Sequence, residues 1–179
     1  MRVFLRDTLT IIAIAAVIVL GQRAIAPKIV VDGPSMNNTL HNGQQIIVNK
    51  VLYRFRPPER GDVIVFYPPI NLRDEYIKRI IGLPGESVEI KDGIVYIHKK
   101  DGTVLPLVEP NISESARSSY KGDVIPENEY FVLGDNRNNS SDSRGGWTVP
   151  FRNILGKAWV SVWPPDRWGL IVNYLANEQ

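Results

Sequence analysis

The sequence contains no cysteine and only two histidines, His41 and His98. The lack of cysteine excludes a disulfide framework, a cysteine nucleophile and a thiolate metal site. Two histidines are too few for a histidine-rich metal site. His41 precedes Asn-Gly and fits a polar turn, and His98 fits an exposed strand end beside two lysines, so a histidine-dependent triad is not favoured. We therefore expect no metal ion and no cofactor.

A strong excess of either charge is also missing. The 179 residues include 21 basic and 19 acidic ones, for a formal net charge of +2. This balance lacks the basic surface with which proteins bind nucleic acid, so we expect no nucleic-acid partner. The length is sufficient for one membrane anchor and one compact domain.

One long apolar run is present near the N-terminus. Residues 8–26 read TLTIIAIAAVIVLGQRAIA, with no charge from Leu9 to Leu20. A helix of this length spans ~28 Å, close to the ~30 Å core of a bilayer. Two arginines precede the run, and the positive-inside tendency keeps that end in the cytoplasm. The sequence thus predicts a cytoplasmic segment 1–7, a transmembrane anchor 8–26 and an extracytoplasmic domain 27–179.

A cleavable signal peptide is the alternative interpretation of this run. Ala24-Ile25-Ala26 has the small-x-small pattern of a cleavage site. Pro27 follows directly, and because proline lacks a backbone N–H and has a fixed φ, it fits an extended peptidase cleft badly. A retained anchor is therefore favoured, although the two alanines are equally well explained as small helix residues.

After Pro27 the chain changes to short segments of period two, rich in Val, Ile, Tyr and Phe. Asp92-Gly93 predicts a hairpin turn, Asp101-Gly102 is a second candidate, and 113–120 is either a short helix or a loop. We expect a mostly β fold: an antiparallel sheet with a smaller β lobe inserted at about 86–127, in addition to the N-terminal transmembrane helix. The expected strands are 28–31, 45–48, 62–67, 75–81, 87–90, 94–98, 130–133 and 158–163.

Lys78 is a candidate base inside the apolar segment Tyr-Ile-Lys-Arg-Ile-Ile. A catalytic lysine must be neutral, yet at its ordinary pKa of ~10.4 only about one in a thousand is neutral near pH 7.4. Burial in apolar surroundings lowers that pKa. On a strand, Tyr76 and Ile80 share the face of Lys78. The alternative is an edge-strand lysine that opposes aggregation, which the pattern alone favours.

Two polar segments are the other candidates for chemistry. Ser35 lies in Gly-Pro-Ser-Met, where glycine and proline indicate a fixed loop that can present a hydroxyl; taken alone, this is only a turn signal. Residues 134–144, GDNRNNSSDSR, concentrate side chains that form local hydrogen bonds and ion pairs. This run is either an ordered polar cluster beside a site or a solvated loop.

Four segments resemble, in the same order, the motifs of bacterial type I signal peptidases, or leader peptidases, which use a Ser–Lys dyad. They are 33–40 (GPSMNNTL), 60–66 (RGDVIVF), 76–86 (YIKRIIGLPGE) and 134–144. The similarity extends from the anchor to about Pro165. Four ordered motifs are highly specific, whereas any one of them alone is not.

The resemblance implies a membrane-bound serine endopeptidase that removes signal peptides from exported precursors after an Ala-x-Ala-like site. Ser35 would be the nucleophile, with its backbone N–H in the oxyanion hole, and Lys78 the general base. The implied supporting residues are Ser140, which orients the amine, and the ion pairs Arg79–Asp135 and Asp142–Arg144. The implied substrate-binding residues are Val31, Ile46, Ile77 and Tyr76.

Two positions depart from the family pattern. Gly33 stands where some members have a serine that donates a second hydrogen bond to the oxyanion, so that donor is unidentified here; one such donor is worth ~3 kcal/mol. Asn38 stands where proline is usual, which we expect to loosen the turn after Met36. Neither change removes the nucleophile or the base.

The implied partners are precursor proteins and the lipid bilayer. Because eight residues (27–34) separate the anchor from Ser35, the site would lie near the outer membrane surface. Lys50, Arg54, Arg56 and Arg60 would either contact anionic headgroups or form a solvated face. Trp163 is expected in the core, and the nearby Trp168, Leu170 and Ile171 form either an interfacial patch or core.

Two other functions fit parts of the sequence. A self-cleaving repressor-type protein also uses a Ser–Lys dyad, but that activity is cytoplasmic and needs no anchor. A membrane-tethered β-domain that binds an export partner needs no catalytic residues. The distance between Ser35 Oγ and Lys78 Nζ distinguishes an enzyme from such a binding domain, because the base must lie within ~2.6–3.2 Å of the proton it removes.

Overall fold

The structure is a computed structural model that describes residues 11–12, 25–112 and 114–175. Most of the predicted anchor, 8–26, lies outside these ranges, so its helix remains a prediction. None of the helical segments within the described ranges has the length and apolarity that a bilayer crossing requires.

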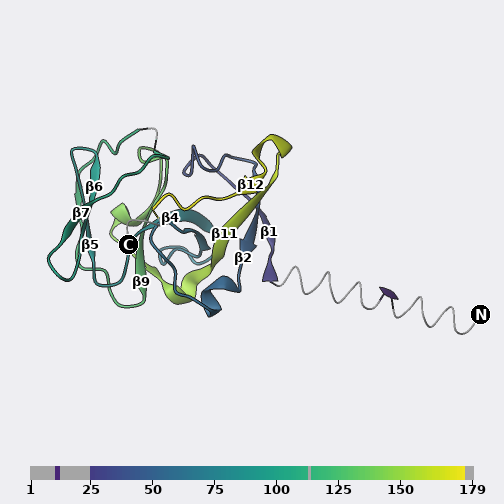
Figure 1. Cartoon of the computed structure of the whole chain (residues 1–179), viewed down its shortest axis with the longest axis horizontal. Helices are drawn as coiled ribbons and strands as arrows, with labels where there is room; N and C mark the ends of the chain where they lie inside the picture. Colours follow the sequence, from purple (N-terminus) through teal and green to yellow (C-terminus); the bar gives the residue numbers. More distant parts are fainter. Residues whose placement is uncertain (1–10, 13–24, 113, 176–179) are drawn as a thin grey trace, which may run out of the picture.

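The described residues form two antiparallel sheets (Figure 1). The larger sheet has the order β1-β2-β11-β3-β4-β9-β10, and β12 also pairs with β11. Its strands are β1 (Lys28–Val30), β2 (Gln45–Asn49), β3 (Val63–Phe66), β4 (Tyr76–Gly82), β9 (Glu129–Leu133), β10 (Val149–Pro150), β11 (Ile154–Trp163) and β12 (Gly169–Leu170).

The smaller sheet has the order β7-β6-β5-β8. Its strands are β5 (Ser87–Lys91), β6 (Ile94–His98), β7 (Val104–Pro106) and β8 (Tyr120–Lys121), all of which lie between β4 and β9 in the sequence. Four short 3-10 helices join elements of the larger sheet: η1 (Leu52–Arg54), η2 (Ser143–Gly145), η3 (Phe151–Asn153) and η4 (Pro165–Arg167).

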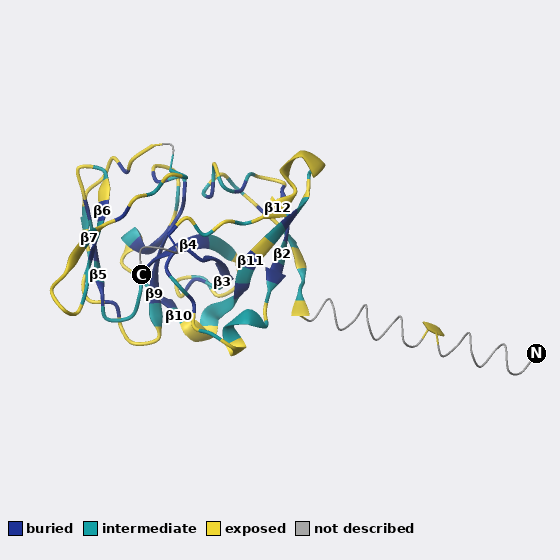
Figure 2. Cartoon of the chain, viewed as in Figure 1, coloured by how far each residue is buried: buried dark blue, intermediate teal, exposed yellow. Residues whose placement is uncertain are grey.

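Strands β3 and β4 form the buried centre of the larger sheet (Figure 2). Every residue of β3 is buried: the strand lies between β11 and β4, and its side chains enter two core clusters, Val63 in one and Ile64 and Phe66 in the other. β4 in turn pairs with β9, and Lys78 lies opposite Ile64 on β3. Lys78 is therefore not on an edge strand, and the interpretation of it as protection against aggregation is wrong.

The smaller sheet has an apolar core of its own, which includes Val88, Ile90, Val95 and Ile97. This core continues onto the larger sheet through Phe131 and other residues of β4 and β9. Burial of both sheets against one apolar layer explains why two sheets of short strands are stable together.

The mostly β, antiparallel fold is confirmed, and every expected strand overlaps an observed one. Asp92 and Gly93 both have positive φ, as the predicted hairpin turn requires. Residues 114–119 contain no helix. The sequence patterns missed β7, β8, β10 and β12, each of two or three residues, because so short a segment shows no period.

Strand β11 begins at Ile154, four residues before the predicted start. Glycine is unfavourable in strands, which hid this part of the strand in the sequence. In the structure a Cβ on Gly156 would lie 2.4 Å from the backbone oxygen of Asn49 on β2, so only glycine permits the two strands to approach here.

Candidate active site

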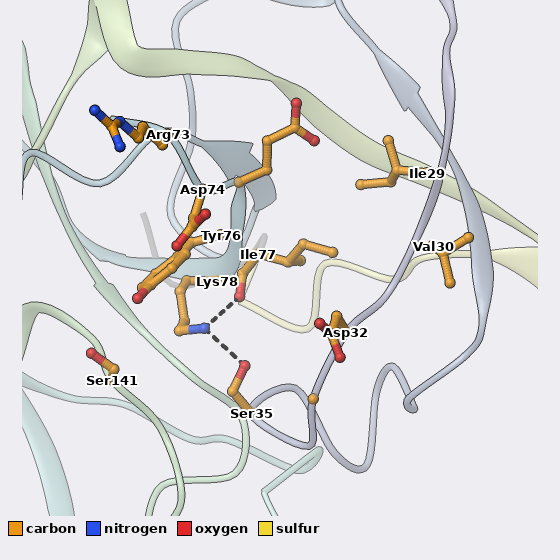
Figure 3. A pocket seen from close by; sticks show the side chains of 12 residues that line it. Ile29, Val30, Asp32, Ser35, Arg73, Asp74, Tyr76, Ile77, Lys78 and Ser141 are labelled. Atoms are coloured by element: carbon orange, nitrogen blue, oxygen red, sulfur yellow. Dashed lines mark hydrogen bonds between the residues drawn. The ribbon is translucent and has the colours of Figure 1, made fainter. Parts of the chain in front are cut away.

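Lys78 Nζ lies 2.8 Å from Ser35 Oγ and donates a second hydrogen bond to the Ile77 carbonyl at 2.9 Å (Figure 3). Lys78 is only 4% exposed. Burial lowers the pKa of its amine to about 8, because the charged form loses its hydration, while the carboxylates of Asp142 and Asp135 partly oppose this shift. A hydroxyl and an amine whose chemistry suits a nucleophile and a base thus lie within hydrogen-bonding distance.

The loop that carries Ser35 is held from two directions. Gly33 has a φ of 86° and its N–H donates to Asn42 Oδ1 at 2.8 Å. From the polar run, the Asn136 N–H donates to the Ser35 carbonyl at 3.0 Å, and Asn136 Nδ2 donates to the Pro34 carbonyl at 3.2 Å. The polar run is therefore an ordered cluster beside the hydroxyl, and Asn136 is a contact that the sequence did not single out.

Arg79 faces away from Lys78, as period two predicts, and forms a buried ion pair with Asp135. Its Nε and one terminal nitrogen donate to the two oxygens of Asp135 at 2.9 and 2.7 Å. Arg79 also donates to Thr39 Oγ1 at 3.2 Å and to the Gly61 carbonyl at 2.8 Å. The Arg79–Asp135 pair thus connects β4, the loop that carries Ser35 and Thr39, and the polar run 134–144.

The second expected ion pair, Asp142–Arg144, is also present, with Nε 2.8 Å from Oδ1. Asp142 in addition accepts a hydrogen bond from the Gly134 N–H at 3.1 Å, which joins the two ends of the polar run 134–144. Such local bonds hold the run in one conformation.

Ser140 lies in the polar run but is not bonded to Lys78. Its Oγ is buried without a hydrogen-bond partner among the described residues. A Cβ on Gly134 would lie 2.2 Å from this Oγ and 2.5 Å from the Ser35 carbonyl, so glycine is needed where Ser140 packs beside the nucleophile's backbone.

A cleft of about 570 Å³ opens beside the dyad. Tyr76 and Ile77 line it, as expected, together with Ile29 and Val30 of the edge strand β1. In Figure 3 Ser35 and Lys78 lie between Asp32 on one side and Ser141 on the other.

The assignment of Val31 and Ile46 to the cleft is corrected by their burial. Both belong to a core cluster, at 3% and 0% exposure, and neither lines the cleft. Ile46 lies beside Ile29, its partner across β1 and β2, and of the two only Ile29 lines the cleft. The resemblance implied these apolar positions, whereas the wall in this structure includes Ile29 and Val30 of β1.

The rim of the cleft carries charges that the sequence analysis missed. Asp32, Asp74 and Glu75 line it together with Arg73. Asp74 accepts a hydrogen bond from the Asn71 side chain at 2.6 Å, and Glu75 from the Tyr67 hydroxyl at 3.2 Å. The Leu-Arg-Asp-Glu run before β4 was the only signal of this rim.

Arg60 does not contact lipid or solvent: it is 1% exposed and forms a two-pronged pair with Glu86 at 2.7 and 3.0 Å. This pair joins the ends of two sequence motifs. Trp163, expected in the core, is instead 51% exposed at the end of β11. Both expectations were wrong because sequence position alone does not show which distant residues meet.

Comparison with known proteins defines the family. The family described as signal peptidase, peptidase S26, matches residues 4–163. The chain belongs to the signal peptidase family. The resemblance of its four motifs to type I signal peptidases is thereby confirmed, and the chain is a serine peptidase of this family. The non-enzymatic binding domain and the repressor-type protein are excluded.

Several signal peptidases are similar over most of their length. The probable signal peptidase I-1 of Synechocystis sp. is 37% identical over 96% of this chain and 89% of its own. Signal peptidase I of Leptolyngbya laminosa is 38% identical over 92% of this chain and 83% of its own. A crystal structure of a signal peptidase I from Enterococcus faecalis has 34% identity and a TM-score of 0.48, and the match covers 56% of this chain and 95% of that one.

Proposed function

We propose that this signal peptidase is a membrane-bound endopeptidase that cleaves exported precursors after an Ala-x-Ala-like site, with Ser35 as nucleophile and Lys78 as general base. One observation carries the proposal: a buried lysine amine of lowered pKa lies 2.8 Å from a serine hydroxyl at the edge of an open cleft. A surface lysine would have neither the burial nor the fixed partner.

In the first half of the reaction, Ser35 Oγ attacks the scissile carbonyl while its proton passes to Lys78 Nζ. The Ser35 N–H stabilises the oxygen anion that forms, and a second donor remains unassigned. Lys78 then donates the proton to the leaving amine, which leaves an ester on Ser35. In the second half, Lys78 takes a proton from water, which attacks the ester and restores the hydroxyl.

Hydrogen bonding around the amine supports a role for Ser140. A neutral amine has one lone pair and two N–H donors. When the lone pair accepts the proton of Ser35, one N–H remains on the Ile77 carbonyl and the other needs an acceptor. Ser140 Oγ is buried and has no partner within the described part of the chain, which makes it the acceptor we propose.

The preference for small residues is proposed from the resemblance to the family, and the cleft contributes apolar walls. Its apolar lining comes from Ile29, Val30, Tyr76 and Ile77, which offer aliphatic and aromatic surface to an extended peptide. We propose that these walls accept small side chains such as alanine on the acyl side of the cleaved bond.

We propose that residues 8–26 anchor the protein in the membrane, with the N-terminus in the cytoplasm. Residues 27–179 then form the extracytoplasmic domain, in which about 86–127 make up the smaller lobe. Ser35 then lies close to the membrane surface at which a translocated precursor emerges. The exposed Trp163, Trp168 and Leu170 fit the same placement, since tryptophan favours the membrane–water interface.

Incubation of the purified full chain, in detergent, with a precursor that carries one Ala-x-Ala site tests the proposal. Wild type and the control Ser119→Ala, a serine exposed in the smaller lobe, should give a product whose mass corresponds to cleavage after the second alanine. Ser35→Ala should be slower by about 10⁴-fold or more. Near-normal cleavage by Ser35→Ala would identify another nucleophile and refute the assignment.

A further inference from the structure

Two of the last described residues, Val172 and Tyr174, contact Arg79, which faces away from Lys78 on β4; we call residues 171–175 the C-terminal strap. The match to the signal peptidase family ends at residue 163, before the strap begins. The Val172 carbonyl accepts a hydrogen bond from Arg79 Nη1 at 3.2 Å. The guanidinium carbon of Arg79 lies 5.6 Å from the centre of the Tyr174 ring, within cation–π range.

The strap is fixed at several points. The Ile171 N–H donates to the Trp159 carbonyl at 2.9 Å. Asn173 Nδ2 donates to the Arg60 carbonyl at 2.9 Å, and Asn173 Oδ1 accepts from the Leu175 N–H at 2.9 Å. Leu175 is fully buried in the core of the smaller sheet. A segment held this firmly can hold Arg79 in turn.

Close packing at Gly61 shows how near the strap comes. A Cβ at this position would lie 1.8 Å from Asn173 Oδ1, and the φ of Gly61 is +87°. The Gly61 carbonyl accepts a hydrogen bond from Arg79 Nη1 at 2.8 Å, and the same nitrogen donates to the Val172 carbonyl. The strap and the turn before β3 therefore enclose one guanidinium nitrogen between two carbonyl oxygens.

We propose that the C-terminal strap positions the active site, with Tyr174 and the Val172 carbonyl holding Arg79 in the orientation that pairs it with Asp135. This inference rests on the proposed function of the dyad. Tyr174 does not touch the reacting atoms, so it is a positioning residue that acts through Arg79.

Arg79 connects the strap to both members of the dyad. It is the neighbour of Lys78 on β4, so a change in the position of its guanidinium can displace the backbone that carries Lys78. Its partner Asp135 directly precedes Asn136, whose N–H holds the Ser35 carbonyl. A small displacement of either reacting group is costly, because catalysis depends on their alignment.

The pair also affects charge at the base. The carboxylates that raise the pKa of Lys78 are Asp142, paired with Arg144, and Asp135, paired with Arg79. The Tyr76 ring, 5.2 Å from Nζ, also favours the charged amine. If Arg79 moves away from Asp135, that carboxylate is less neutralised and raises the pKa of Lys78 further. The fraction of neutral base at a given pH then falls.

Substitution of Tyr174 tests the inference in the full chain. Tyr174 is 43% exposed, so Tyr174→Leu should fold. Loss of the ring contact should lower kcat by about two- to fivefold with little change in KM, and should move the acid limb of the kcat/KM profile to higher pH. Tyr174→Phe keeps the ring and should restore both values. Phe151→Leu, which changes an aromatic side chain of similar exposure (40%) on η3, is the matched control and should behave as wild type.

Asn173→Ala provides a second variant, because it releases the strap from Arg60 without changing the ring, and should lower kcat at least as much. Unchanged kcat and acid limb in both variants would overturn the inference, as would equal losses in Tyr174→Phe and Tyr174→Leu. If wild type shows no cleavage that depends on Ser35, the proposed function fails and the strap's role fails with it. Normal wild-type cleavage with unaffected strap variants refutes the strap alone.

Discussion

Lys78 and Arg79 are adjacent cations on β4, both buried, yet their surroundings are opposite in kind. The Lys78 amine contacts a hydroxyl and a backbone carbonyl, and no carboxylate of the described residues forms a hydrogen bond with it. The Arg79 guanidinium has a two-pronged pair with Asp135 and further bonds to Thr39, Gly61 and Val172.

The difference follows from what each side chain can do when it loses water. A guanidinium cannot release its proton in a protein, so a buried arginine needs a carboxylate. A lysine can become neutral instead, and its burial shifts the pKa from 10.5 to about 8. A shift of that size increases the neutral fraction at pH 7 by about 300-fold. Period two on one strand thus places an amine that can become neutral on one face and a permanent cation on the other.

The largest expected effect is on kcat/KM and comes from replacing Lys78 by arginine, the residue found at position 79. Lys78→Arg puts a permanently charged group beside Ser35, which cannot accept its proton. We expect kcat/KM to fall by about 10⁴-fold or more, measured with the Ala-x-Ala precursor. Near-normal turnover would reject Lys78 as the base and with it the contrast between the two cations.

Removal of the partner of Arg79 should strongly reduce stability. Asp135→Asn leaves the guanidinium buried without a countercharge, at an expected cost of about 3–5 kcal/mol in the free energy of unfolding by urea. The control is Asp166→Asn, because Asp166 lies 3.9 Å from Arg167 and its side chain is 74% exposed. This variant should change the free energy of unfolding by less than about 1 kcal/mol. Similar small effects in both variants would show that the buried pair does not brace the site.

Replacement of Lys78 by an apolar residue should stabilise the protein at neutral pH. The folded-state pKa is about 8 and the ordinary value 10.5, so the unfolded chain binds more protons between these values and stability rises with pH there. Below pH 8 the wild type carries the whole cost of the buried amine, about 3 kcal/mol. Lys78→Met should recover up to about 3 kcal/mol in urea unfolding at pH 7, and progressively less toward pH 10.5. An equal gain at both pH values would contradict the lowered pKa.

The smallest expected effect concerns the hydroxyl that joins the nucleophile loop to the ion pair. Thr39 Oγ1 donates to Asp135 and accepts from Arg79 at 3.2 Å. Thr39→Val should cost about 1–2 kcal/mol in unfolding free energy, whereas Thr39→Ser should retain most of the stability. Equal losses in both variants would assign the effect to packing of the methyl group and not to the hydrogen bonds.

The strands of this fold were largely predictable, because alternation of apolar residues is a local signal. β4 and β6 were located almost to the residue. The same pattern did not show whether Lys78 was at an edge or in the centre, since that depends on β3 and β9, which are distant in sequence. Its pairing with Ser35 came from the family resemblance and not from the strand pattern.

Long-range polar contacts were the least predictable feature of the site. Arg60 and Glu86 are 26 residues apart, and a charged residue is ordinarily expected at the surface. Asn136 contacts the Ser35 carbonyl across a hundred residues, through backbone that carries no sequence signal. Val31 and Ile46, which the resemblance implied as substrate-binding residues, are core residues that do not line the cleft in this structure.

The protonation state of Lys78 is the central claim, and a direct titration tests it. The sample is Ser35→Ala labelled with ¹³C at lysine Cε. The NMR signal of Lys78 is assigned as the one that disappears in Ser35→Ala/Lys78→Met. Its chemical shift should titrate with a midpoint near pH 8. Exposed lysines, for which the ordinary pKa is ~10.4, provide the internal comparison in the same spectrum. A midpoint for Lys78 that coincides with those exposed lysines would contradict the account, because the amine would then be protonated at every pH at which the enzyme is proposed to act.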